Sequence, residues 1–359
     1  MMIGKINLFN FKSLFILNTF ALIVTSYIFS NYIFLAIFIL FFLISLLTTK
    51  HGLKIFTKFR LFQNIRNTGP SRHFNKQNTP TTGGVFIIIP FLILLLLLSS
   101  NFYTIKILLI FFCTFGFFII GLIDDYLSIK NKRNTGLKSS AKFILQSLIS
   151  IIFIFLAFAQ GYINPFIMIS TSLGIDTNIM ILPISFFTLV GLSNSVNLTD
   201  GLDGLASGCS AIVFYGLGTE ILLKGQQELI IFSILCYSMS GLCLGFLNYN
   251  KYPAKIFMGD TGSLSIGAIL GSISILTNSF FTLFIFSGIF IMESLSVIIQ
   301  VGFFKITKKL FNSGKRIFLM APLHHHFELQ GIREAKIVEN FWKINICLVI
   351  FGIVLKINL

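Results

Sequence analysis

Long runs of apolar residues recur along this chain, for example at 92–98 and 151–159. A helix of about 20 such residues spans the hydrocarbon core of a bilayer, which is roughly 30 Å thick. Only 11% of the 359 residues are charged, whereas soluble domains have roughly a quarter. The sequence therefore excludes an ordinary soluble protein. It predicts an all-α, polytopic transmembrane helical bundle that forms a single integral membrane domain over residues 1–359.

Polar breaks divide the chain into about ten predicted spans. The spans cover residues 28–48, 83–100, 105–123, 141–159, 179–196, 206–223, 229–247, 263–277, 281–304 and 340–356. The stretch 1–27 is also apolar, but Lys5, Lys12 and several Asn predict an interfacial or partly embedded helix there. An eleventh span is the alternative for this stretch.

Basic residues predict the orientation, because connections rich in Lys and Arg stay on the cytoplasmic side. Most of the 27 Lys and Arg residues lie in four connections, at 48–80, 124–142, 251–255 and 305–338, which alternate with nearly uncharged ones. We predict that these four connections are cytoplasmic and that both termini, after ten spans, are periplasmic. Topology and attraction to anionic lipid explain the positive charge, so we expect membrane lipid and no nucleic acid as a partner.

The 12 acidic residues are informative against the net charge of +15. Seven of them lie in or beside the four cytoplasmic connections, namely Asp124, Asp125, Asp200, Asp203, Asp260, Glu328 and Glu334. Connections that are far apart in the sequence therefore supply carboxylates to one face of the membrane. This pattern predicts a site that tertiary structure assembles at the cytoplasmic face.

Asp124 and Asp125 directly follow the third predicted span, at what would be its C-terminal end. A helix C-terminus carries partial negative charge, and a carboxylate there is disfavoured by about 0.3–1 kcal/mol. The two acids also repel each other. A divalent cation with oxygen ligands would compensate for both effects. The alternative is a solvated helix end with Lys130 and Lys132 nearby.

Two further acidic motifs flank predicted spans. Turn chemistry alone could explain NLTDGLDG at 197–204, but no basic residue lies between Gly161 and Leu223 to pair with its acids. The motif FMGDTGS at 257–263 precedes the eighth predicted span. Asp260 or Thr261 could simply cap that helix, or the helix N-terminus could bind a phosphate.

Three consecutive histidines, His324, His325 and His326, lie in the last basic connection. Consecutive residues of a helix cannot all face one metal ion, so contacts with phosphate are more plausible than a zinc site. Glu293, near the middle of the ninth predicted span, should face a helix partner or a cavity. Pro80 keeps the residue before it out of a helix, so the motif TPTTGG at 79–84 predicts an ordered polar entry into the second span.

In this order, the motifs TPTTGG, DDY, NLTDGLDGLA, FMGDTGS and APLHHHFEL resemble those of the polyprenyl-phosphate N-acetylhexosamine-1-phosphate transferase superfamily, over residues 60–345. Within it, the chain is most similar to the branch that makes lipid I for peptidoglycan. The resemblance implies transfer of phospho-N-acetylmuramoyl-pentapeptide from its UDP carrier to undecaprenyl phosphate, with release of UMP and a requirement for Mg²⁺. It also implies a multi-pass protein of the bacterial inner membrane, for which a homodimer is one option.

The resemblance further implies roles for single residues. Asp260 matches the magnesium-binding aspartate, and Asp124 and Asp125 match an essential pair near the metal and the lipid phosphate. The residues that match substrate-binding positions are Lys76, Thr81, Lys142, Asn197, Asp200, Asp203, Asn250 and Phe257. Phe257 resembles the aromatic residue that stacks on uracil. His324, as a catalytic candidate, and His325 and His326 match the histidine motif that separates this branch from relatives using other sugars.

The chain departs from the family pattern at Asn78, Thr82 and Ser128, where Gly, Met and Lys are usual. A sister transferase that uses UDP-N-acetylglucosamine is one alternative. A transporter of an anionic solute is another, although transporters bind near the bilayer midplane and most of these acids lie at the rim. Two routes also stay open for the reaction. The lipid phosphate attacks in line, with Asp124 orienting or deprotonating it, or the transfer passes through an aspartyl-linked phosphosugar.

Overall fold

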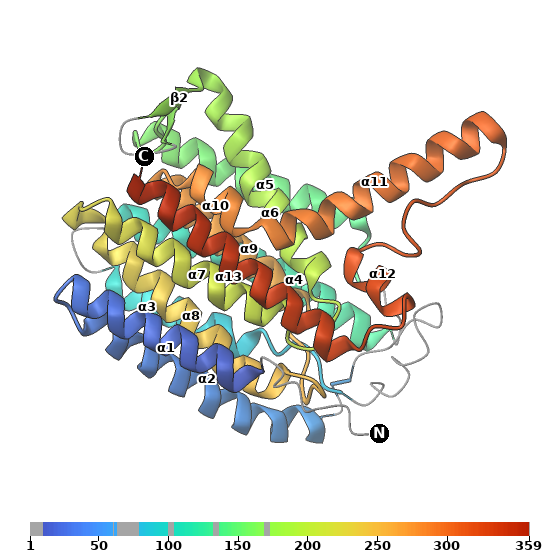
Figure 1. Cartoon of the computed structure of the whole chain (residues 1–359), viewed down its shortest axis with the longest axis horizontal. Helices are drawn as coiled ribbons and strands as arrows, with labels where there is room; N and C mark the ends of the chain where they lie inside the picture. The colour runs from blue at the N-terminus through green and yellow to red at the C-terminus, as the bar shows by residue number, and fades with distance from the viewer. Residues whose placement is uncertain are drawn as a thin grey trace.

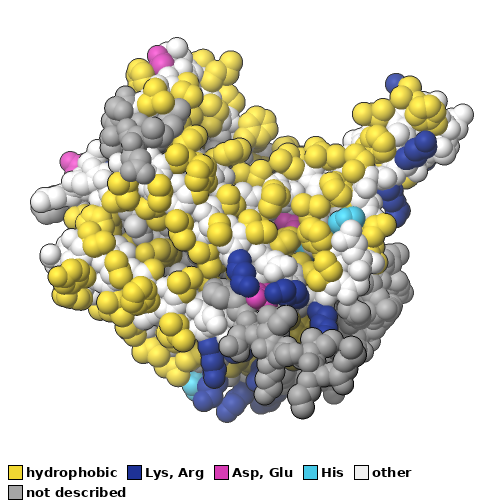
Figure 2. Space-filling view, in the orientation of Figure 1, with side chains coloured by type: hydrophobic (Ala, Val, Ile, Leu, Met, Phe, Trp, Pro, Cys, Tyr) yellow, Lys and Arg dark blue, Asp and Glu magenta, His cyan; other side chains and the backbone are white. Residues whose placement is uncertain are grey.

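The computed structural model describes residues 10–59, 61–62, 79–99, 104–131, 136–168 and 173–358. These residues form a bundle in which most of the helices run side by side (Figure 1). Hydrophobic side chains are spread over the face shown in Figure 2, while the Lys and Arg side chains visible among the described residues lie near its centre and toward the right and lower edge. A surface of this kind is suited to a lipid environment, with one charged end outside the hydrocarbon.

The elements follow one another in a helical order that one short hairpin interrupts. The helices are α1 Phe11–Ile28, α2 Ile33–Lys58, α3 Val85–Leu98, α4 Thr104–Lys130, α5 Ser139–Ala159, α6 Ile181–Thr199, α7 Leu205–Leu223, α8 Ile230–Asn250, α9 Gly259–Thr277, α10 Phe280–Phe286, α11 Gly288–Phe311, α12 Leu323–Leu329 and α13 Glu334–Asn358. The strands β1 Phe166–Met168 and β2 Gly174–Asp176 pair antiparallel. The predicted all-α bundle is therefore confirmed, with this hairpin as an addition.

Ten of the described helices are long and apolar enough to cross a membrane. The number of spanning helices agrees with the prediction, but the helices are not all the predicted ones. The predicted span 83–100 forms α3, which has 14 residues and is shorter than a bilayer core requires. The tenth long helix is α1, in the stretch for which an interfacial helix was expected and a span was the alternative. It packs along α2 (Figure 1).

The predicted span 281–304 is wrong in its limits. The chain bends at Ser287, which separates the short α10 from α11. α11 then continues to Phe311 and projects away from the bundle (Figure 1). Both pieces are apolar, so hydropathy alone could not locate the break between them.

The described part of the chain starts and stops at opposite ends of the bundle. Asn10, just before α1, lines a pocket together with Asp203 and Lys251. In the last turn of α13, Lys356 Nζ lies 4.0 Å from Glu220 Oε1, near the other end of α7. The predicted topology placed both termini on one side because its count of spans left out α1.

Glycines bring α9 close to two neighbouring helices. A Cβ added to Gly121 of α4 would lie 2.3 Å from the backbone oxygen of Asp260, and one added to Gly267 would lie 2.4 Å from Cα of Ser193 in α6. Small residues allow this close approach in membrane helix packing. The result is that polar side chains of α4, α6 and α9 meet at one end of the bundle.

Candidate active site

Three carboxylates from two helices converge at the end of the bundle where α4 and α9 meet. Asp124, Asp125 and Asp260 each offer an oxygen, and these atoms lie within 4.8 Å of one another. Asp124 and Asp125 are buried, and the Asp260 side chain is 21% exposed. The structure therefore brings together two motifs whose proximity the sequence predicted.

The place of the aspartate pair within α4 differs from the prediction. The helix does not end at the pair but continues to Lys130, so Asp124 and Asp125 lie more than one turn inside it. Helix-dipole effects fade within the last turn, so the predicted dipole penalty does not apply here. The two acids are nevertheless costly, because both are buried and they repel each other. The predicted alternative of a solvated helix end is thus wrong.

Asp125 caps α9 from a neighbouring helix. Its Oδ1 accepts a hydrogen bond from the backbone N of Asp260 (3.0 Å), and its Oδ2 accepts from the backbone N (3.1 Å) and the hydroxyl (2.6 Å) of Thr261. The first N–H groups of a helix have no partner within it. The expectation that Asp260 or Thr261 caps α9 is therefore replaced by a cap that α4 supplies. Gly259, with φ +72°, leaves the space that this contact needs, since a Cβ there would lie 2.5 Å from Asp125 Oδ2.

Lys142 of α5 and Asn197 of α6 complete the surroundings of Asp260. Lys142 Nζ lies 3.0 Å from Asp124 Oδ1 and also pairs with Asp260 Oδ2. Asn197 Nδ2 donates to Asp260 Oδ1 (2.7 Å). Side chains from two neighbouring helices, α5 and α6, thus hold the Asp260 carboxylate in a fixed orientation.

The loop between α6 and α7 brings a fourth carboxylate to this cluster. Asp200 accepts a hydrogen bond from the backbone N–H of Gly259, next to Asp260. Burial, followed by the negative charges of Asp260 and Asp125, raises the pKa of Asp200 well above its usual range. Asp203, by contrast, ties the loop to other segments. Its Oδ2 accepts from the N of Ala254 (2.8 Å), and its own N donates to Glu334 Oε1 (2.8 Å).

The donor set of this cluster fits a hard divalent cation. Magnesium prefers carboxylate oxygens and is held by few protein ligands. Within the described part of the chain, Lys142 is the only cation that forms an ion pair with Asp124 or Asp260. The cluster therefore retains an excess of negative charge that a divalent cation can balance. Asp124 and Asp260 are the better ligand candidates, because Asp125 already accepts three hydrogen bonds.

The chain at 79–84 pairs with the chain that leads into α9. The backbone N of Phe257 donates to Pro80 O, and the N of Gly83 donates back to Phe257 O, both at 2.8 Å. Thr81 is buried between them at 4% exposure. This pairing fixes Phe257 beside the entry to α3, as the predicted ordered entry requires. Lys76 and Asn78 lie outside the described residues.

Asn250 supports the loop that carries Phe257. Its Nδ2 donates to Ile256 O (3.0 Å), and its Oδ1 accepts from the hydroxyl of Ser207 (2.8 Å). The side chain is 2% exposed. Both polar atoms of its amide are therefore engaged within the protein.

The three histidines bind three different partners. His324 Nδ1 lies 3.0 Å from Glu293 Oε2, and His325 Nδ1 lies 2.7 Å from Glu328 Oε2. His326 Nδ1 accepts from the backbone N of Leu319 (3.2 Å). Each ring is therefore held by a different group, and the absence of a zinc site at these residues stays a prediction. The expectation that Glu293 faces a helix partner is confirmed.

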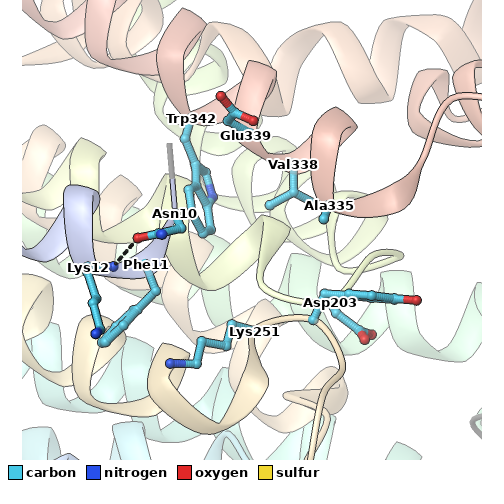
Figure 3. Close-up of a pocket in the computed structure, with 10 residues that line it drawn as sticks. Asn10, Phe11, Lys12, Asp203, Lys251, Ala335, Val338, Glu339 and Trp342 are labelled. Carbon is cyan, nitrogen blue, oxygen red and sulfur yellow. Dashed lines mark hydrogen bonds between the residues drawn. The ribbon is translucent and has the colours of Figure 1, made fainter. Parts of the chain in front are cut away.

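A pocket of about 290 Å³ lies beside Asp203, where α1, the loop after α8 and the first turns of α13 meet (Figure 3). Its lining includes Phe11, Lys12, Lys251 and Trp342. Lys251 Nζ lies 4.2 Å from the centroid of the Phe11 ring. Burial, followed by the charges of Lys12 and Lys255, lowers the pKa of Lys251. The sequence did not predict this pocket, because α1, which forms one wall, was expected at the membrane surface.

Comparison with known proteins identifies the family. Residues 107–278 match the model of glycosyl transferase family 4. The chain is 74% identical to a phospho-N-acetylmuramoyl-pentapeptide-transferase of Prochlorococcus marinus strain MIT 9301, over 100% of both chains. It is 41% identical to the protein of that name in Synechococcus sp. strain CC9605, over 86% of this chain and 89% of the relative. The chain therefore belongs to the phospho-N-acetylmuramoyl-pentapeptide-transferase family.

Proposed function

We propose that this chain transfers phospho-N-acetylmuramoyl-pentapeptide from its UDP carrier to undecaprenyl phosphate, giving lipid I and UMP in peptidoglycan synthesis. The observation that carries the chemistry is the convergence of Asp124, Asp125 and Asp260. The names and full-length similarity of the relatives support the choice of substrates.

In this reaction an oxygen of the lipid phosphate attacks the phosphorus that is bonded to the sugar. A new P–O–P linkage forms, the bond from that phosphorus to UMP breaks, and UMP leaves with the electron pair. Two anions must therefore approach each other, so charge neutralisation and positioning supply most of the catalysis. Bound Mg²⁺ would neutralise charge on the phosphate oxygens, with Asp260 and Asp124 as its protein ligands.

The chain's own residues provide the positioning. Asp125 fixes the first turn of α9 and hence Asp260, while Asn197 orients the Asp260 carboxylate. Lys142 supplies a positive charge between Asp124 and Asp260. We favour direct attack by the lipid phosphate, with Asp124 orienting or deprotonating it. Each of the three carboxylates already accepts a hydrogen bond from a neighbouring group. These bonds support direct attack over a route in which a carboxylate acts as the nucleophile.

The site end of the bundle faces the cytoplasm in this proposal. Lys50, Lys54 and Lys58 lie in the last turns of α2, which ends there, and Lys251 and Lys255 follow α8 at the same end. Basic residues of this kind favour the cytoplasmic side. In this proposal α1 crosses the membrane, and α3 carries the chain from the cytoplasmic to the periplasmic side although it is shorter than a straight span requires. Asn10 would then lie at the cytoplasmic end, and α13 would end on the periplasmic side. The protein is then a multi-pass protein of the bacterial inner membrane, and a homodimer stays a prediction.

The sugar specificity separates this proposal from a sister transferase. We expect the purified full chain, with Mg²⁺ and undecaprenyl phosphate, to release UMP from UDP-N-acetylmuramoyl-pentapeptide. UDP-N-acetylglucosamine should give a kcat/KM at least about 100-fold lower, because it lacks groups that the site binds. Equal rates with the two sugar nucleotides, or a preference for UDP-N-acetylglucosamine, would make the sister transferase the better assignment.

A further inference from the structure

Three polar side chains recur on one face of α11. Glu293, Gln300 and Thr307 are spaced seven residues apart, which places them along one side of a helix. They are 0%, 9% and 4% exposed, respectively, although α11 projects from the bundle (Figure 1). Buried polar groups need hydrogen-bond partners, so this stripe must face a segment that covers it.

The chain that returns from the end of α11 provides the cover. Thr307 Oγ1 accepts from the backbone N of Lys315 (2.9 Å). Gln300 Oε1 accepts from the N of Phe318 (3.0 Å), and Gln300 Nε2 donates to Phe318 O (2.8 Å). Glu293 Oε1 accepts from the N of His324 (3.2 Å). The three side chains thus bind successive points of the returning segment in antiparallel order, and the last of them positions His324.

The Glu293 carboxylate also fixes the orientation of the His324 ring. Its Oε2 lies 3.0 Å from Nδ1, in a pair whose two side chains are each 1% exposed. A carboxylate can only accept a hydrogen bond, so Nδ1 carries the proton. Nε2 is buried and has no hydrogen-bond partner among the described residues.

The ring faces the loop that connects Asp200 to Asp203. A Cβ added to Gly201 would lie 2.2 Å from His324 Nε2. The ring therefore packs directly against the backbone of this loop. Glu293, on a helix that projects from the bundle, is connected through one imidazole to the loop that supplies Asp200 to the carboxylate cluster.

We propose that Glu293 is a positioning residue that acts through His324 on the 200–204 loop. Gln300 and Thr307 hold the part of the returning segment that lies further from the ring, and Glu293 alone holds the His324 ring against Gly201. This inference rests on the proposed function, because it assigns the loop to binding of the sugar nucleotide. A loss of the lock should weaken binding of that substrate and leave binding of the lipid phosphate unchanged.

The test is Glu293→Gln, which keeps the size of the side chain but removes one acceptor oxygen and the charge. We expect KM for UDP-N-acetylmuramoyl-pentapeptide to rise about tenfold, which is the effect of losing one charge-assisted hydrogen bond. KM for undecaprenyl phosphate should stay within about twofold of the wild type. In a His324→Asn background, Glu293→Gln should have no further effect, because it acts only through the ring.

Thr307→Val is the matched control, since it breaks a contact of the same stripe without touching His324, and it should keep both KM values. Gly201→Ala tests the contact from the loop side and should also raise KM for the sugar nucleotide, which keeps the proposal testable if Glu293→Gln fails to fold. Unchanged KM values in Glu293→Gln, or an effect that persists without His324, would overturn it. UMP release by the wild type is measured first. If the wild type releases no UMP, the proposed function fails; if it does and the variants do not behave as expected, only this inference fails.

Discussion

Replacing Asp260 with Asn should lower Mg²⁺-dependent UMP release by at least about 10²–10³-fold, the effect of removing one preorganised electrostatic group from an active site. The substitution keeps the size of the side chain and leaves an oxygen for Asn197 to donate to. It removes the negative charge that pairs with Lys142 and that would bind the metal. Because Asp125 still caps α9 through backbone groups, the protein should remain folded. Release of UMP from both substrates is the measurement.

Asp176→Asn is the control for this prediction. Asp176 is exposed in β2. Its hairpin lies near the end of α9, since Phe166 O accepts a hydrogen bond from Asn278, the residue after α9. Asp260 lies at the start of α9, so the two carboxylates are at opposite ends of the bundle. The same loss of one carboxylate there should leave the rate unchanged. A fully active Asp260→Asn variant would remove the central residue from the proposed mechanism.

Replacing Lys142 with Met should lower the rate by about 100-fold and also lower the melting temperature of the Mg²⁺-free protein. Lys142 is the described cation between Asp124 and Asp260, and without it buried carboxylates repel each other uncompensated. Mg²⁺ binds the folded state and stabilises it by mass action. Added Mg²⁺ should therefore raise the melting temperature more in Lys142→Met than in the wild type, as a thermal unfolding scan can measure.

Lys138→Met provides the matched comparison, since Lys138 is an exposed lysine just before α5. It should show wild-type activity and a wild-type response to Mg²⁺. If Mg²⁺ stabilised the wild type and Lys142→Met equally, the cation would not be binding between the carboxylates that Lys142 neutralises.

Much of the site could be predicted because its chemistry is visible in the sequence. Acids are rare in this basic, apolar chain, so Asp124, Asp125, Asp200 and Asp260 stand out from their neighbours. Their convergence follows from the predicted topology, since each motif adjoins the predicted cytoplasmic end of a span. The buried position of Glu293 also implied a partner, because an uncompensated acid inside a membrane is costly.

The rest depended on contacts between segments that are far apart in the sequence. Asp125 was expected to bind metal, which stays a prediction, but the sequence did not show that it also caps a helix 135 residues away. The partner of Glu293 lies 31 residues further along the chain, in α12, beyond the end of α11 and the segment that returns from it. Hydropathy likewise could not show whether α1 is a membrane span or an interfacial helix, because both kinds of helix are rich in apolar residues. Local pattern identifies such residues but does not show which groups they contact.

The central claim is that Asp260 and its neighbours hold a divalent cation, and Mn²⁺ binding followed by electron paramagnetic resonance tests it most directly. Mn²⁺ has the ligand preferences of Mg²⁺, and the signal of the free ion reports how much is bound. We predict a saturable Mn²⁺ site in the wild type and in Asp176→Asn, competed by Mg²⁺, with affinity at least about tenfold weaker in Asp260→Asn. Equal Mn²⁺ affinity in the wild type and in Asp260→Asn would contradict the account.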